Sequence, residues 1–168
     1  MKKVALFIAF QGFRDEEYIE PKNILEKAKV KVDTISTTKG KARGKIKITT
    51  DIDKTLDEIS ISEYDCLALV GGPGALEYLD NKKVHKIFTD FYNQNKPIAA
   101  ICISPVILAH AGLLKGKKAT VWIDGKNELE KNGAIYTGNP VEIDGNIITA
   151  NGPAAAKEYG NAIVEKIN

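Results

Sequence analysis

The amino-acid sequence predicts an α/β protein in which helices cover both faces of a doubly wound, mostly parallel sheet. Strand-like and helix-like segments alternate along the chain, an order that produces parallel sheets through crossover connections. Several strand segments are continuous apolar runs, as expected of strands buried on both faces. The length of 168 residues suits one domain, so we expect residues 1–168 to form a single unit.

The first half of the chain begins with the apolar run Val4–Ala9, which predicts a central strand. Lys45–Thr49 alternates polar and apolar residues and predicts a half-exposed antiparallel strand. Val84, Phe88 and Phe91 recur at helical spacing. In order, the predicted elements are a strand at Val4–Ala9, a helix from Asp15 to Ala28, strands at Val30–Ile35, Lys45–Thr49 and Cys66–Val70, and a helix that continues to Asn95.

The second half begins with the apolar strand Ile98–Ile101, and the pattern is looser beyond it. The dipeptide Asp144-Gly145 is typical of a hairpin turn. In order, the predicted elements are a strand at Ile98–Ile101, a helix that ends at Gly112, a strand at Lys118–Trp122, a helix at Lys126–Asn132, strands at Ala134–Tyr136, Val141–Ile143 and Ile147–Thr149, and a C-terminal helix through Tyr159 and Ile167.

The composition argues against several classes of function. A net charge of +2 is too small for a nucleic-acid-binding surface. The basic stretch Lys39–Lys47 is interpreted as a solvated loop, with an anion-attracting rim of the site as the alternative. No apolar run reaches the ~20 residues of a membrane span, and Met1–Lys3 leads into a strand rather than a signal peptide. We therefore expect a cytoplasmic protein with no membrane or nucleic-acid partner.

The two cysteines do not form a disulfide framework, and neither they nor the two histidines have the spacing of metal ligands. We therefore expect no metal and no cofactor. Cys66 lies within an apolar strand and is interpreted as a small buried hydrophobe. Cys102 follows the strand Ile98–Ile101 and precedes a helix that begins near Ser104, which predicts a nucleophile elbow. The partial positive charge of the helix start predicts a lowered pKa for Cys102.

Three strand ends with unusual chemistry are expected to meet at one edge of the sheet. They are the loop Gln11–Glu17, the pair Gly71-Gly72 and Cys102. The backbone N–H groups of Gly72 and Ile103 could together form an oxyanion hole. A carboxylate from the first loop could hydrogen-bond the sulfur.

With these motifs, the chain resembles the ThiJ/PfpI superfamily (the DJ-1/PfpI family, related to class I glutamine amidotransferases) over its whole length. The matching segments are Asp15–Pro21, Lys45–Asp51, Tyr64–Gly72, Ala99–Pro105, Asp144–Pro153 and Ala162–Glu165. The resemblance implies a flavodoxin-like sandwich and a homodimer. It also implies that Cys102 is the reactive cysteine, that Glu17 hydrogen-bonds it, and that Gly72 and Ile103 are the oxyanion-hole donors.

The chain departs from the family pattern around the cysteine. Ile103 stands where the peptidase branch has a histidine, and Trp122 lies near the histidine of the other branch. Ser104 replaces a glycine and could cap the elbow helix, and we expect Gly71, Ser104 and Trp122 to shape the pocket. His85 is expected to face solvent and His110 to pack against the sheet, both in structural roles.

We rank the functions that the resemblance implies by how well each fits these departures from the family pattern. The first is glyoxalase-like or deglycase-like action of Cys102 on small reactive carbonyl compounds. The second is a redox-sensing or chaperone-like role in oxidative stress, in which Cys102 is oxidised. A cysteine peptidase or amidase is the weakest, because a general base is missing. A member that kept the fold and lost its activity is a further alternative.

Overall fold

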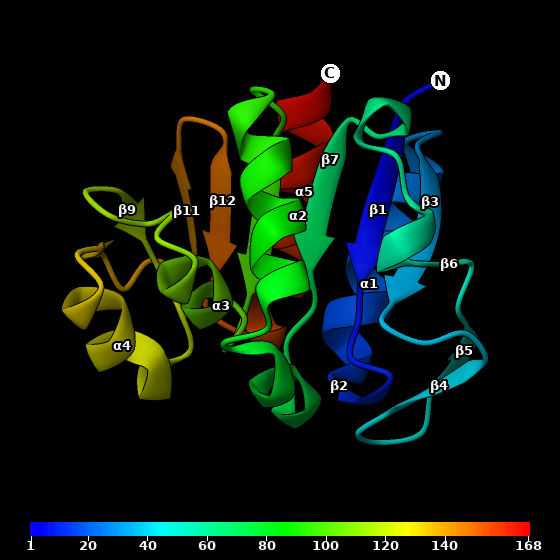
Figure 1. Ribbon diagram of the computed structural model, residues 1–168, viewed down its shortest axis with the longest axis horizontal. Coiled ribbons are helices and arrows are strands. Elements are labelled where there is room, and N and C mark those ends of the chain that lie inside the picture. Colours follow the sequence, from blue (N-terminus) through cyan, green and yellow to red (C-terminus); the bar gives the residue numbers. More distant parts are fainter.

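Seven strands form the central sheet of the computed structural model, which describes residues 1–168 (Figure 1). The strands lie in the order β11-β12-β8-β7-β1-β3-β6, and only β11 and β12 pair antiparallel. This arrangement confirms the predicted class. The strands are β1 (Lys3–Phe7), β3 (Lys31–Ser36), β6 (Lys54–Thr55), β7 (Cys66–Leu69), β8 (Ile98–Ile101), β11 (Val141–Asp144) and β12 (Ile147–Ala150).

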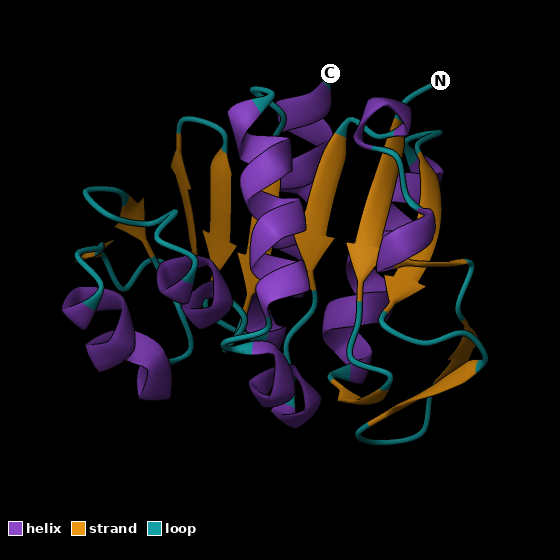
Figure 2. Cartoon of the chain, viewed as in Figure 1, coloured by secondary structure: helices purple, strands orange, loops and turns teal.

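Helices cover both faces of the sheet (Figure 2). In Figure 1, α2 crosses the front of the sheet, and α1 and α5 lie behind it. The helices are α1 (Asp15–Lys27), α2 (Lys82–Asn93), α3 (Pro105–His110), α4 (Lys126–Lys131) and α5 (Ala156–Ile167). Two small sheets complete the fold, one formed by β2 (Gln11–Phe13), β4 (Lys41–Gly44) and β5 (Thr49–Asp51), the other by β9 (Lys118–Ala119) and β10 (Ile135–Tyr136).

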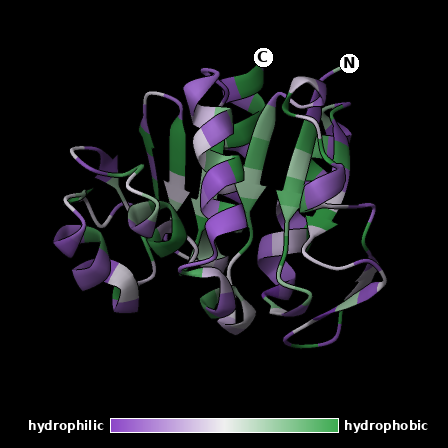
Figure 3. Ribbon diagram, in the orientation of Figure 1, coloured by the Kyte–Doolittle hydropathy of each residue, from purple (hydrophilic) through white to green (hydrophobic).

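Burial explains why the central elements form where the sequence predicts them. Every residue of β7 and β8 is buried, so both strands are apolar throughout (Figure 3). On α2, Val84, Phe88 and Phe91 are completely buried at one-turn spacing, which sets the face that packs on the sheet. No helix is long and apolar enough to cross a bilayer.

Most of the segment predicted as a strand at Lys45–Thr49 is instead a hairpin loop, and only Thr49 belongs to a strand, β5. β4 and β5 pair on either side of it, and the Asp15 carboxylate accepts hydrogen bonds from the N–H groups of Ile46, Lys47 and Ile48 at 3.1, 2.8 and 2.8 Å. A side chain distant in sequence therefore satisfies the backbone that a partner strand would have paired.

Several other boundaries shift by one or two residues, and two of the differences can be explained by hydrogen bonds or strand pairing. The strand expected at Lys118–Trp122 ends at Ala119, because the N–H of Thr120 donates to the Thr149 hydroxyl rather than to a neighbouring strand. Asp144 is the last residue of β11, so the two-residue hairpin loop is Gly145-Asn146.

Candidate functional site

Cys102 lies on a sharp turn between β8 and α3, at the sheet edge to which the carboxyl ends of the parallel strands point (Figure 1). Its φ angle is 65°, in the left-handed region that non-glycine residues rarely adopt. Its N–H donates to Ala150 O at 2.9 Å, and its C=O accepts the N–H of Trp122 at 2.7 Å. Hydrogen bonds on both sides thus hold the residue in a conformation that costs free energy.

Glu17 lies beside the Cys102 thiol, although 85 residues separate them in the sequence. It is completely buried in the first turn of α1, and its Oε2 accepts the N–H of Gly71 at 2.9 Å. Its Oε1 is buried without a well-aligned hydrogen-bond partner. A Cβ atom at Gly71 would lie 2.5 Å from both Cys102 Cβ and Glu17 Oε2. Glycine at this position therefore lets the carboxyl and the thiol approach each other.

The protonation state of Glu17 and that of Cys102 depend on each other. Burial raises the pKa of Glu17 to about 7, although its interactions with Cys102 and the Gly71 N–H act in the opposite direction. Burial and the neighbouring Glu17 carboxylate raise the pKa of Cys102 to about 12. The helix start predicted a lowered pKa for the Cys102 thiol. That prediction is wrong while Glu17 is ionised, because burial and the carboxylate charge raise the pKa instead. The pair shares one proton at neutral pH.

Two backbone donors face the sulfur. The N–H groups of Gly72 and Ile103 both hydrogen-bond Cys102 and favour its ionised form. Gly72 has a φ of 103°, and a Cβ there would lie 2.5 Å from the backbone nitrogen of Arg14. The structure thus brings the predicted donors together with Cys102 and Glu17 at one point.

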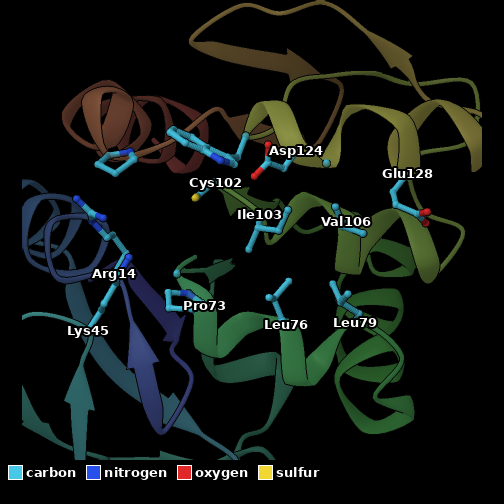
Figure 4. Close-up of a pocket in the computed structure, with 14 residues that line it drawn as sticks. Arg14, Lys45, Pro73, Leu76, Leu79, Cys102, Ile103, Val106, Asp124 and Glu128 are labelled. Carbon is cyan, nitrogen blue, oxygen red and sulfur yellow. The ribbon is translucent and has the colours of Figure 1, made fainter.

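This point opens into a pocket of about 530 Å³ (Figure 4). Its lining residues are Arg14, Lys45, Gly72, Pro73, Leu76, Leu79, Cys102, Ile103, Val106, Trp122, Asp124, Gly125, Glu128 and Pro153. Trp122 forms part of the wall, with its ring over Gly152, where a Cβ would lie 2.8 Å from the indole. Gly71 and Ser104 are buried behind Cys102 and do not line the pocket, contrary to the prediction.

Charged residues stand on opposite sides of the cysteine. Arg14 and Lys45 lie on one side, and Asp124 and Glu128 on the other (Figure 4). Of the basic stretch Lys39–Lys47, only Lys45 lines the pocket. Arg14 belongs to the loop Gln11–Glu17, which the sequence placed at the site. The sequence does not distinguish Asp124 and Glu128 from other charged residues, because charged residues near loops are common on any protein surface.

Neither histidine lines the pocket, but each contacts a residue that does. Nε2 of His85 is 2.7 Å from Leu79 O, so this side chain is only half exposed rather than free in solvent. His110 does not pack against the sheet as predicted. Its ring nitrogens lie 2.9 Å from Asp80 Oδ1 and 2.9 Å from Glu128 Oε2, and these carboxylates raise its pKa although burial opposes them.

Comparison with known proteins places this geometry among related chains. The family described as DJ-1/PfpI matches residues 2–166. A protein of Methanocaldococcus jannaschii described as uncharacterized is 44% identical over 168 residues, covering 98% of this chain and 82% of that protein. A protein of Pyrococcus furiosus named deglycase PfpI is 33% identical over 148 residues, covering 88% of this chain and 89% of that one.

Solved structures share the whole architecture. A ThiJ/PfpI domain protein from Brachyspira murdochii superposes with a TM-score of 0.97 at 32% identity, covering 99% of this chain and 96% of the other. DJ-1beta from Drosophila melanogaster gives a TM-score of 0.90 at 29% identity, with coverage of 99% and 91%.

Proposed function

The chain belongs to the DJ-1/PfpI family, and on this premise we propose that it converts small reactive carbonyl compounds through Cys102, in the manner of a glyoxalase or deglycase. One observation carries the proposal. The Cys102 sulfur, the proton-holding carboxyl of Glu17 and the N–H groups of Gly72 and Ile103 meet at the base of one pocket. Relatives named deglycases, including those of Pyrococcus furiosus and Thermococcus kodakarensis, support the same chemistry.

Addition to the aldehyde is the first step. The Cys102 thiolate forms an S–C bond with the aldehyde carbon, and the π electrons of the C=O bond move to its oxygen. The N–H groups of Gly72 and Ile103 stabilise that oxygen. Glu17 supplies the proton that the oxygen takes up.

A 2-oxoaldehyde can then rearrange without an external oxidant. Glu17 removes the hydrogen of the former aldehyde carbon as a proton and returns it to the neighbouring carbonyl carbon. The hydroxyl proton on the first carbon passes to the oxygen of the second carbon. The first carbon is thereby oxidised to a thioester and the second reduced to an alcohol. Water cleaves the thioester, releasing a 2-hydroxy acid and the Cys102 thiol. The net change is the addition of one water molecule.

Amide hydrolysis fits the pocket less well. The leaving nitrogen of an amide must be protonated, and a general acid typically contributes about 10²–10⁴-fold. Neither His85 nor His110 lines the pocket, and the indole of Trp122 cannot relay a proton at neutral pH. We therefore expect no cleavage of casein or small amides.

Methylglyoxal consumption tests the proposal. We expect the wild-type protein and a Cys66→Ser control to consume it, and Cys102→Ser to lose at least about 10²-fold in rate because the nucleophile is gone. Equal activity of Cys102→Ser and wild type would exclude Cys102 chemistry. No turnover by any of the three proteins would exclude this substrate class.

A redox response is the second candidate, supported by the same donors. Gly72, Ile103 and a protonated Glu17 could hydrogen-bond the oxygens of a Cys102 sulfinate. After mild peroxide, mass spectrometry should find two added oxygens on Cys102 and none on Cys66, which is completely buried. A stable adduct without aldehyde turnover would favour this function over the first.

We also propose a cytoplasmic location and a homodimer. A reducing compartment would keep both cysteines as free thiols. Light scattering would distinguish a dimer from the monomer of 18.3 kDa.

A further inference from the structure

The turn that carries Cys102 contains a buried hydroxyl that the proposed chemistry does not use. Ser104 is completely buried, two residues after the cysteine. Its Oγ donates a hydrogen bond to Ile101 O at 2.7 Å and accepts one from Ile101 N–H at 3.0 Å. Ser104 occupies the N-cap position of α3, but its side chain makes no cap bond, contrary to the prediction. The hydroxyl therefore bonds backward to β8 rather than forward to the helix.

The backbone of Ile101 has no strand partner on one side, because β8 extends one residue beyond its pairing with β7. The last residue pair between β7 and β8 is Leu69 with Ala100. The N–H of Cys102 points to β12, where it donates to Ala150 O. Since backbone groups alternate sides along a strand, the N–H and C=O of Ile101 point the other way, to where β7 has ended. The Ser104 hydroxyl supplies both the acceptor and the donor that a strand would have provided.

The position of these bonds connects them to the site. Residues 101–104 form the turn that holds Cys102 at a φ of 65° and directs the Ile103 N–H toward the sulfur. Gly71 borders the same turn, because a Cβ on it would lie 2.7 Å from Ile101 O. Without the hydroxyl, the buried N–H of Ile101 would lose its acceptor, and Ile101 O would keep only the bond from the Ser104 backbone N–H at 3.2 Å. The turn would then relax so that the Ile101 N–H recovers a partner.

We propose that Ser104 is a positioning residue, whose paired hydrogen bonds to Ile101 fix the turn that presents the Cys102 sulfur and the Ile103 N–H to the substrate. This inference rests on the proposed role of Cys102 as the reacting group. It assigns Ser104 no contact with substrate, in agreement with its place behind the pocket wall.

Alkylation of Cys102 by iodoacetamide tests the inference without any aldehyde turnover. In Ser104→Ala we expect the rate between pH 7.5 and pH 9 to fall about tenfold, because a misdirected Ile103 N–H stabilises the thiolate less. If methylglyoxal is a substrate, kcat should fall by a similar factor while KM changes little.

Ser36 provides the matched control. It is also completely buried at the end of a strand, β3, and its Oγ donates to Ile8 O at 2.8 Å, but it does not line the pocket. Ser36→Ala should lower the melting temperature as Ser104→Ala does, and leave the alkylation rate within about twofold of wild type. Ser104→Thr keeps the hydroxyl and should restore the rate. Ser104→Gly is measured in place of Ser104→Ala if that variant does not fold.

Two results would overturn the inference. The first is an unchanged alkylation profile in Ser104→Ala and Ser104→Gly, and the second is an equal loss of rate in Ser36→Ala. An aldehyde-inactive wild type whose alkylation still depends on Ser104 would refute the proposed function and leave the positioning role standing.

Discussion

At the scale of single residues, the site depends on one proton held between Glu17 and Cys102. An ionised carboxylate beside a thiolate would place two like charges in a buried site, so only one of the two groups ionises near neutral pH. With the proton on Glu17, the N–H groups of Gly72 and Ile103 favour the thiolate. The reactive form is thus the one in which the carboxyl is neutral and ready to donate.

This coupling predicts the pH profile of Cys102 alkylation. Wild type should show a first rise near pH 7, where the pair loses its first proton, followed by a plateau up to at least pH 9. Glu17→Gln removes the carboxylate charge that raises the thiol pKa, so its profile should be a single step without a plateau. A single wild-type step at the ordinary ~8.5 of a free thiol would show that the groups are uncoupled.

At the scale of elements, Asp15 holds the β4–β5 hairpin against the start of α1. Its carboxylate is 5% exposed and receives the N–H groups of three consecutive loop residues. These hydrogen bonds lower its pKa, although burial acts in the opposite direction. The same loop places Lys45 at the pocket, so the anchor of the hairpin also shapes the site.

Asp15→Ala should therefore release the hairpin. Three backbone N–H groups of the loop would lose a charged acceptor, and we expect the free energy of unfolding to fall by roughly 3 kcal/mol. Limited trypsin digestion should then cut after Lys45 and Lys47 much faster than in wild type. Asp51→Ala is the control, because its ion pair with Lys41 at 2.9 Å is exposed and contributes little. Equal trypsin resistance of all three proteins would contradict the anchoring role.

Lys45 should make the pocket selective for anions. It has no ion-pair partner in the protein and lies on the Arg14 side of Cys102 (Figure 4). Lys45→Glu should lower the alkylation rate of Cys102 by anionic iodoacetate, relative to neutral iodoacetamide, by about fivefold, since exposed charges interact weakly. Lys47→Glu makes the same charge change outside the pocket and should leave the ratio unchanged. An equal effect of both variants would point to general charge instead.

Sequence patterns located the buried elements better than the exposed ones, for a physical reason. β8 forms at the predicted residues, Ile98–Ile101, because burial on both faces requires an apolar run that the sequence displays. The alternation at Lys45–Thr49 predicted a strand that does not form, because the Asp15 carboxylate accepts the backbone N–H groups that a partner strand would have paired. Strand order also indicated that Gly72 and Cys102 would meet. The pKa of Cys102 could not be predicted, because it depends on burial and on Glu17, which only the folded chain brings to the sulfur.

At the scale of the whole molecule, the site is assembled where loops that follow β1, β7 and β8 meet at one sheet edge (Figure 1). That placement carries a carboxyl into the interior at Glu17, which is completely buried. Burying an ionisable group that has few partners destabilises its charged form. The burial of Glu17 that serves the site therefore lowers the stability of the fold when the carboxyl is ionised, and the size of this loss depends on pH.

The folded state raises the pKa of Glu17 from 4.5 to about 7. The stabilisation of its protonated form is fully present below pH 4.5 and is lost as the pH rises through 7. Between pH 5 and pH 8 this change in the free energy of unfolding amounts to about 2.5 kcal/mol. His110, whose pKa is also raised, acts in the same direction, so the difference between wild type and Glu17→Gln isolates the carboxyl. Urea unfolding should show Glu17→Gln more stable than wild type at pH 8, with the gap narrowing toward pH 5. A gap that does not change with pH would mean that Glu17 is ionised throughout and does not hold the proton on which the chemistry of Cys102 depends.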